Sequence, residues 1–253
     1  MSKGRTLALR PDPGGHVPET AMVMAAGLGK RMRPLTATRP KPLVEVAGKP
    51  LIDHVFDRLR SAGVRRAVVN VHYLADALEA HLRARVKDIE VVISDERGQL
   101  LETGGGLVKA RPLLGDEPIL VINADSLWID GPTDAIRALA AAWDGERMDA
   151  LLLMVPYARA HGYRAQGDFH LDALGRITGR RKRGRVAPFV YVGVQMIHPR
   201  IIADAPEGPF STNLFWQRAI EAGRAWGLVH QGLWFEVGEP AAIGEAEAIL
   251  AHG

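Results

Sequence analysis

The chain has 253 residues, enough for one large α/β domain with a sizeable core, and its 32 lysines and arginines against 29 aspartates and glutamates leave a net charge of +3. This charge is too mild to indicate a nucleic-acid partner, and the absence of cysteine excludes disulfides, thiolate nucleophiles and cysteine-held zinc. No apolar run approaches the roughly 20 residues that span a bilayer, so we expect a cytoplasmic protein without a membrane partner.

The first twenty residues mix cations, prolines and glycines without a hydrophobic stretch, which predicts a flexible arm over 1–20 and a single domain over 21–253. Apolar strand-like runs then alternate with helical patterns. We expect strands over 21–25, 67–71, 89–93, 119–122 and 150–155, and helices over 51–62, 75–84, 105–111 and 133–143. Such alternation is typical of an α/β fold with a mostly parallel sheet and helices on both faces, which binds ligands beyond the C-terminal strand ends.

The pattern changes after residue 155. Short alternating segments such as 169–171, separated by glycine turns, predict a small antiparallel insertion. A longer strand is expected over 189–197, and the alanine-rich segment 240–250, with proline at its first turn, predicts a closing helix. Nothing in the sequence specifies an oligomeric state.

A glycine-rich turn with three cations follows the first predicted strand. The segment Ala25–Arg33 reads AAGLGKRMR, and Lys41 stands shortly after it. Such a turn brings backbone N–H groups and positive charge to a polyphosphate, which indicates nucleotide binding. Two commoner phosphate motifs are excluded, because Met24 stands at the first glycine of a Walker A loop and Met32 at the third glycine of a dinucleotide fingerprint.

The pattern G-x-G-x-R-M-x-P-L-T, followed by K-P, closely resembles the signature of the sugar-1-phosphate nucleotidylyltransferases. The likeness extends over about residues 21–250, with matching segments at 43–52, 102–106, 122–125 and 232–238. It implies a Rossmann-like nucleotidyltransferase fold, with a nucleotide-binding part over 21–155. The sugar-binding part, which includes the antiparallel insertion and the closing helix, is expected over 156–253.

The resemblance implies transfer of a nucleotidyl group from a nucleoside triphosphate, UTP or GTP, to a sugar 1-phosphate, with Mg²⁺ as cofactor. Within the family, the segments 101–106 and 167–169 are most similar to the uridylyltransferases of N-acetylmuramate 1-phosphate in peptidoglycan recycling. The mannose-1-phosphate guanylyltransferases share much of the pattern. A regulatory protein that binds nucleotide-sugars without turnover is a third alternative, since Ala124 and Glu236 replace the family's usual glycine and aspartate.

The resemblance assigns catalytic roles to Arg31, Lys41 and Asp125. A sugar phosphate is already an anionic nucleophile, so the protein has to position two anions and neutralise charge. Arg31 is expected at the departing pyrophosphate and Lys41 at the α-phosphate or the sugar phosphate. Asp125 is expected to hold magnesium, with a looser contact from Glu236, whereas the alternative for Asp125 is a helix N-cap.

The remaining candidate residues are binding residues. For the nucleotide they are Ala25, Ala26, Gly27, Gly29, Arg31, Lys41, Gln99, Thr103, Gly104 and Asn123. For the sugar, by resemblance alone, they are Asp168, Gly193 and Asn213. Lys30 and Arg33 fit a solvated surface. The basic run 180–185 contains no aromatic residue that could stack on bases, which leaves a solvated loop or a flap over the anionic product.

Overall fold

The computed structural model describes residues 13–251, so residues 1–12 of the expected arm lie outside the described residues. The described end of the arm is packed onto the domain, because Val17 contacts the main core and Pro18 is buried. The first strand, β1, begins at Thr20. The folded domain therefore begins slightly before the predicted boundary.

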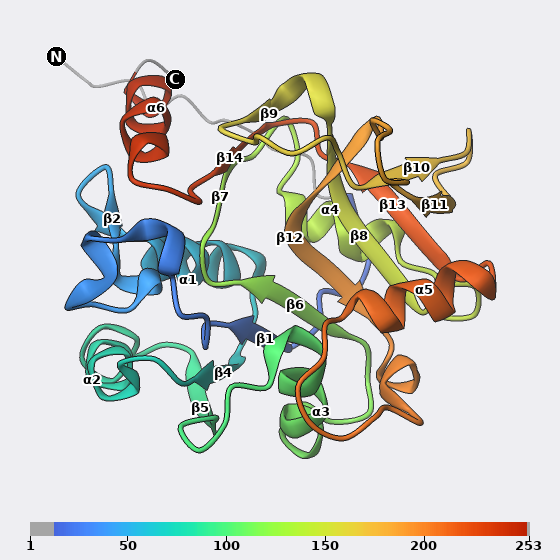
Figure 1. Ribbon diagram of the computed structural model, residues 1–253. Helices are drawn as coiled ribbons and strands as arrows, with labels where there is room; N and C mark the ends of the chain where they lie inside the picture. The colour runs from blue at the N-terminus through green and yellow to red at the C-terminus, as the bar shows by residue number, and fades with distance from the viewer. Residues whose placement is uncertain (1–12, 252–253) are drawn as a thin grey trace, which may run out of the picture.

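The order of helices and strands follows the predicted alternation (Figure 1). The helices are α1 (Leu51–Ala62), α2 (Ala75–Arg85), α3 (Glu102–Leu114), α4 (Ala135–Ala142), α5 (Asn213–Glu221) and α6 (Ala241–Leu250). The strands up to the middle of the chain are β1 (Thr20–Met24), β2 (Glu45–Val46), β3 (Lys49–Pro50), β4 (Arg66–Val71), β5 (Glu90–Asp95), β6 (Ile119–Asn123) and β7 (Ser126–Ile129). The later strands are β8 (Ala150–Pro156), β9 (Ala160–His161), β10 (Phe169–Leu171), β11 (Ile177–Arg180), β12 (Phe189–Ile197), β13 (Ala225–Val229) and β14 (Leu233–Glu236). Within residues 13–251, every helix is too short or too polar to cross a bilayer.

The main sheet is mixed and has nine strands among the described residues, in the order β11-β10-β12-β6-β1-β4-β5, with β8 beside β12 and β13 beside β8. The β6-β1-β4-β5 portion is parallel, whereas β12 runs antiparallel to both β6 and β8. The predicted α/β class with an antiparallel insertion is confirmed. The insertion is continuous with the main sheet, because β12 pairs directly with β6.

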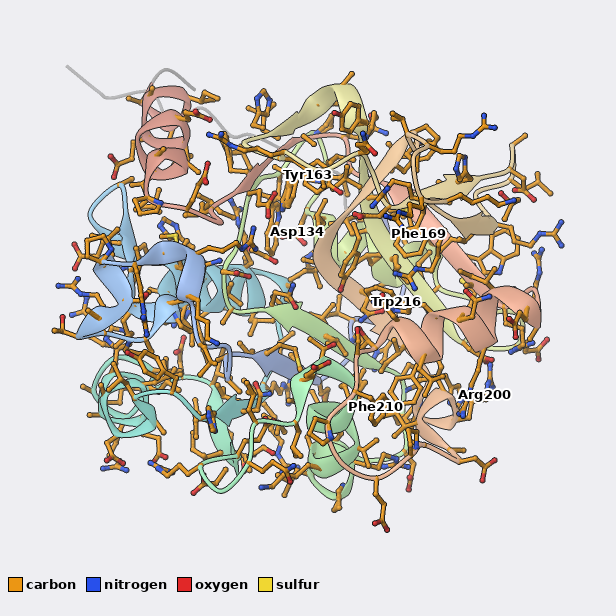
Figure 2. All side chains as sticks on the ribbon, in the orientation of Figure 1. Asp134, Tyr163, Phe169, Arg200, Phe210 and Trp216 are labelled. Carbon is orange, nitrogen blue, oxygen red and sulfur yellow. The ribbon has the colours of Figure 1, made fainter. Side chains whose placement is uncertain are left out.

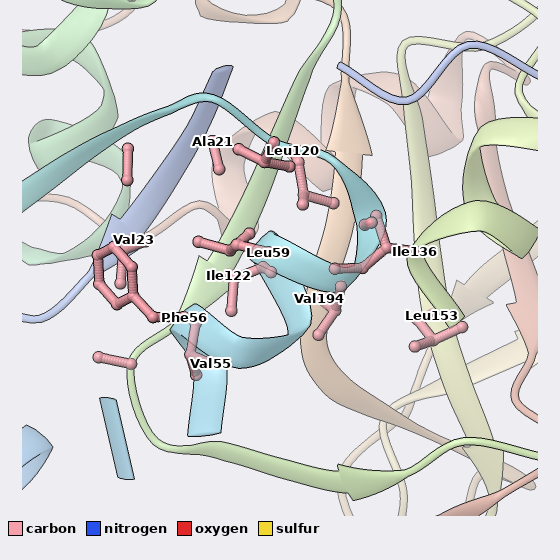
Figure 3. Packing of buried hydrophobic residues seen from close by; sticks show 14 of the residues in the cluster. Ala21, Val23, Val55, Phe56, Leu59, Leu120, Ile122, Ile136, Leu153 and Val194 are labelled. Carbon is pink, nitrogen blue, oxygen red and sulfur yellow. The ribbon is translucent and has the colours of Figure 1, made fainter. Parts of the chain in front are cut away.

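Helices cover both faces of the sheet, and the alternation of side chains along β1 assigns each face. Ala21 and Val23 point toward α1, α2 and α4, where Phe56 of α1 packs in the larger core cluster (Figure 3). Met22 points to the opposite face and packs with Leu107 of α3 and with residues of α5. Both core faces leave the C-terminal strand ends free for a ligand site.

Helix α3 is longer than the pattern predicted, since it begins at Glu102 rather than at Gly105. Three consecutive glycines lower helix propensity, so periodicity alone understates this helix. The tertiary structure uses these glycines for close packing: a Cβ on Gly105 would lie 2.4 Å from the carbonyl oxygen of Gly208. The first turn of α3 is thereby held against the 208–210 loop.

A small third core cluster supports the segments that contain the candidate phosphate ligands. Met32 and Val46 pack with Ala246 of α6 and Phe235 of β14. Figure 1 shows α6 beside β2, although the two elements lie far apart in the sequence. The backbone N–H of Ala47 donates to Glu247 of α6 over 2.8 Å. The predicted closing helix thus fixes the early loops from outside the main sheet.

Candidate active site

A cleft of about 410 Å³ opens at the C-terminal ends of β1, β4 and β6, the edge at which parallel α/β sheets bind ligands. Its lining comes from strand ends and the loops that follow them. The lining residues are Met24, Ala25, Ala26, Gly27, Gly29, Lys41, Pro42, Asn70, Leu100, Glu102, Thr103, Asn123, Ala124, Asp125 and Ser211. The cleft therefore joins segments that are separated by most of the chain.

Most of the expected nucleotide residues are brought together in this cleft. The predicted residues in the lining are Ala25, Ala26, Gly27, Gly29, Lys41, Thr103, Asn123 and Asp125. The predicted residues outside the lining are Arg31, Gln99, Gly104, Asp168, Gly193, Asn213 and Glu236. Roles for all of these residues remain proposals, and their positions are described below.

Asp125 and Lys41 form an ion pair across the cleft. The Nζ atom of Lys41 lies 2.5 Å from Oδ2 of Asp125, and the two side chains are 14% and 36% exposed. Asp125 lies in the turn between β6 and β7, so the alternative of a helix N-cap is wrong. The pair places one positive and one negative group beside the glycine turn, where a phosphate and a cation can each find an opposite charge.

Arg31 and Glu236 form a second, more open pair at the edge of the cleft. The Nη1 atom of Arg31 lies 3.4 Å from Oε1 of Glu236, and the arginine side chain is 75% exposed. Glu236 ends β14 opposite Ser126 of β7, so it lies next to the turn that carries Asp125. The two carboxylates thus come from neighbouring strands, although they are far apart in the sequence.

Asp125 and Glu236 are of the side-chain type that can hold magnesium together with phosphate oxygens of a substrate. Among residues 13–251, no three His, Cys, Asp or Glu side chains are grouped so that they could hold a metal ion by themselves. Magnesium prefers oxygen ligands and is usually bound through one or two carboxylates together with substrate phosphates and water. Asp125 and Glu236 match that donor set.

A buried hydrogen-bond network that sequence reasoning missed holds the glycine turn in place. Asn70 accepts from the N–H of Ala25 over 2.6 Å and donates to Oε1 of Glu96 over 2.8 Å. The other oxygen of Glu96 accepts from the N–H of Leu101 over 3.1 Å, and Glu96 is fully buried. Asn70 lies near the end of one apolar strand, and Glu96 lies just after another. A polar residue in this position is the sequence signal that could have predicted their place beneath the site.

We expect Glu96→Gln to destabilise the protein, because an amide presents its NH₂ group to one of the two buried donors and leaves that donor unsatisfied. The expected loss in the free energy of unfolding is about 1–3 kcal/mol, measured by urea denaturation. Glu207→Gln is the matched control, since Glu207 is exposed. Equal stability of the two variants would show that the network does not hold the loops.

The expected base-binding residues separate into two environments. Thr103 lines the cleft, and its Oγ1 accepts from the N–H of Thr212 over 2.9 Å. Gly104 is buried beside Phe210, to whose carbonyl oxygen its N–H donates over 2.7 Å. Gln99 is exposed and lies outside the cleft lining. Thr103 is therefore the expected base ligand that has direct access to the cleft.

Two of the three expected sugar residues line a second hollow of about 190 Å³. Its lining residues are Gly167, Asp168, Phe169, Arg180, Arg181, Tyr191, Asn213 and Trp216. Gly193 lies instead beneath the cleft wall, because a Cβ there would come within 2.8 Å of Nδ2 of Asn123 and closer still to Ser126. The hollow thus contains Asp168, Asn213 and the first residues of the basic run.

Asp168 is engaged by the protein itself. Its Oδ1 accepts from the hydroxyl of Tyr163 over 2.9 Å, and its Oδ2 accepts from the N–H of Tyr191 over 3.0 Å. Burial, together with the charge of Asp168, raises the pKa of Tyr163 well above its usual range, so the hydroxyl stays protonated and remains a donor. Asp168 consequently ties the 167–169 segment to β12.

Residues 20–172 match the family model described as nucleotidyl transferase. The chain belongs to this family. It is 54% identical over 240 residues to the N-acetylmuramate alpha-1-phosphate uridylyltransferase of Caulobacter vibrioides, which covers 94% of this chain and 99% of that protein. The mannose-1-phosphate guanylyltransferase catalytic subunit beta of Danio rerio is 30% identical over 231 residues, which cover 87% of this chain and 61% of that protein.

The fold of this nucleotidyl transferase also occurs among solved structures. The inositol-1-phosphate CTP transferase from T. maritima superposes with a TM-score of 0.76 at 20% identity, covering 94% of this chain and 97% of that one. The family resemblance expected from the glycine turn is therefore confirmed, and so is the Rossmann-like nucleotidyltransferase fold.

Proposed function

We propose that this nucleotidyl transferase moves the uridylyl group of UTP to N-acetylmuramate 1-phosphate. An oxygen of the sugar phosphate attacks the α-phosphorus of UTP. The bond between that phosphorus and the oxygen bridging the α- and β-phosphates breaks, so pyrophosphate is the leaving group and UDP-N-acetylmuramate is the product. The observation that carries the proposal is the cleft with the Lys41–Asp125 pair at the strand ends. The likeness of nearly the whole chain to the Caulobacter uridylyltransferase supports the choice of UTP and of this sugar phosphate.

The residues act by positioning anions and neutralising their charge, since the attacking oxygen needs no base. The side chain of Asn70 holds the backbone of Ala25 through a hydrogen bond. Gly27 is exposed and lines the cleft, where the nucleotide is expected. Lys41 would bind the α-phosphate or the sugar phosphate as a point charge. Arg31, whose guanidinium can form two parallel hydrogen bonds, would hold the departing pyrophosphate.

Asp125 and Glu236 would hold Mg²⁺, which would neutralise negative charge on the triphosphate. Both carboxylates already face a cation, Lys41 and Arg31 respectively. The charges within each of these two pairs therefore balance, and an incoming phosphate gives each of these cations a second anionic partner.

We also assign the reaction to the cytoplasm, where UTP is available, and to the recycling of peptidoglycan sugars.

Incubation with each pair of substrates and measurement of pyrophosphate tests the proposal. We expect release with UTP and N-acetylmuramate 1-phosphate in the presence of Mg²⁺, and little release with GTP and mannose 1-phosphate. The reverse preference would favour a guanylyltransferase. Binding of UDP-N-acetylmuramate in calorimetry, without pyrophosphate release from any pair, would favour a regulatory protein.

A further inference from the structure

The second hollow and the nucleotide cleft are lined by neighbouring residues of the same chain segment. Asn213 in the hollow follows Ser211 in the cleft closely along the chain. Tyr191 in the hollow lies on β12 near Gly193, which packs against Asn123 of the cleft. The hollow and the cleft therefore lie near each other, and we expect a ligand whose phosphates lie at Lys41 to direct its distal part toward the hollow.

Arg180 and Arg181 line this hollow, and within the part of the chain that the structure describes neither forms an ion pair. Several other arginines of the protein form ion pairs. Examples are Arg58 with Asp130, Arg97 with Asp76 and Arg200 with Asp149. Two arginines without carboxylate partners among the residues that line a hollow are suited to an anionic group that arrives with the ligand.

The backbone beneath the two arginines is held in place. Arg180 pairs with Phe169 in the β10–β11 ladder, and the N–H of Arg181 donates to the carbonyl oxygen of Asp168 over 2.7 Å. Asp168 is the one carboxylate among the lining residues, and its two oxygens are occupied by Tyr163 and Tyr191. The lining therefore carries two positive charges against one negative charge, and the N-terminus of α5 at Asn213 adds partial positive charge.

The floor of the hollow is aromatic. Figure 2 shows Phe169 and Trp216 close together, and their ring centroids lie 5.7 Å apart. The ring of Tyr191 meets Trp216 at a centroid distance of 5.0 Å, and the indole N–H of Trp216 donates to the buried Gln195. A small group that combines a methyl with a carboxylate fits such a surface, because the methyl can pack on the rings while the carboxylate meets the arginines.

We propose that Arg180 and Arg181 bind the lactyl carboxylate of N-acetylmuramate 1-phosphate and thereby select this sugar. The lactyl ether is the group that distinguishes N-acetylmuramate from N-acetylglucosamine, and it carries both a methyl and a carboxylate. A planar guanidinium can hold a carboxylate through two parallel hydrogen bonds. Neutral sugars such as mannose offer no partner for these charges. The inference rests on the proposed function, whose site it extends.

The test compares N-acetylmuramate 1-phosphate with its lactyl carboxamide analogue, each with UTP and Mg²⁺. The analogue keeps the shape of the substrate and removes the charge. We expect the wild-type protein to favour the acid in kcat/KM by about 10- to 100-fold, the range of a charge-assisted contact. The double variant Arg180→Ala/Arg181→Ala should lose this preference, mainly through a higher KM for the acid, so that the acid and the carboxamide are turned over with similar kcat/KM.

Arg183→Ala is the matched control, since Arg183 belongs to the same basic run but does not line the hollow. It should retain the preference for the acid. A thermal unfolding midpoint of the double variant close to that of the wild type shows that the variant is folded. Wild-type turnover without any preference, or a preference that survives in the double variant, would overturn this inference and leave the proposed function intact. No wild-type turnover of N-acetylmuramate 1-phosphate would overturn both.

Discussion

Lys41→Ala is expected to lower kcat/KM by about 10²- to 10³-fold, because it removes a positive charge from the place where the phosphates meet and charge shifts in the transition state. The fold should survive. The partner of Lys41, Asp125, is 36% exposed, so water can solvate it once the lysine is gone. A partly exposed pair such as this one contributes about 1 kcal/mol to the free energy of unfolding. Steady-state kinetics and thermal unfolding of the same preparation separate the two effects.

Arg33→Ala is the matched control, because Arg33 is an exposed cation in the same loop and lies outside the cleft lining. It should change kcat/KM little. The magnesium concentration for half-maximal rate gives a second measurement: it should not rise in Lys41→Ala, since that change removes a cation beside Asp125. Near-normal kinetics of Lys41→Ala would remove the phosphate role, and a strongly raised magnesium requirement would indicate that Lys41 acts through the metal site.

The grouping of most expected nucleotide residues in one cleft could be predicted, because these residues stand in local motifs at strand ends. The segment Ala25–Gly29, Asn123 and Asp125 each follow an apolar run, and the carboxyl ends of parallel strands meet at one edge of the sheet. Lys41 is predicted by the family pattern. In the structure it begins η3 (Lys41–Leu43), which packs beside α1, and its side chain contacts Asp125. Periodicity and motif spacing were therefore enough to predict that these residues lie together in the nucleotide cleft.

The network beneath the cleft and the wall of the hollow could not be predicted in the same way. Asn70 contacts Ala25, and Glu96 contacts Asn70, only after the β1-β4-β5 pairing has formed. The sequence leaves Arg180 and Arg181 in a basic run that is either a solvated loop or a flap over the anionic product, and the β10–β11 hairpin places them in the hollow beside α5. Gly104 was expected to bind the nucleotide, but Phe210 covers it from a loop distant in the sequence. Each of these contacts depends on tertiary structure.

Asp125→Asn is expected to lower activity by at least about 10²-fold, because an amide supplies neither the negative charge nor the ligand strength that magnesium prefers. Asp125 is a short side chain in the turn between β6 and β7, so little conformational freedom is lost when it holds an ion. Activity is measured as a function of magnesium concentration. Asp204→Asn, a change at an exposed position, serves as the control and should behave as the wild type does.

Glu236 should contribute less than Asp125. It has one more rotatable bond, so it loses more freedom on reaching the ion, and it already pairs with the exposed Arg31. We expect Glu236→Asp to be tolerated and to lower the magnesium concentration for half-maximal rate, since the shorter side chain restores the family's usual residue next to Asp125. Glu236→Ala should raise that concentration. A fully active Asp125→Asn protein would contradict the metal assignment, and an unchanged magnesium requirement of Glu236→Ala would leave Asp125 as the one protein carboxylate on the ion.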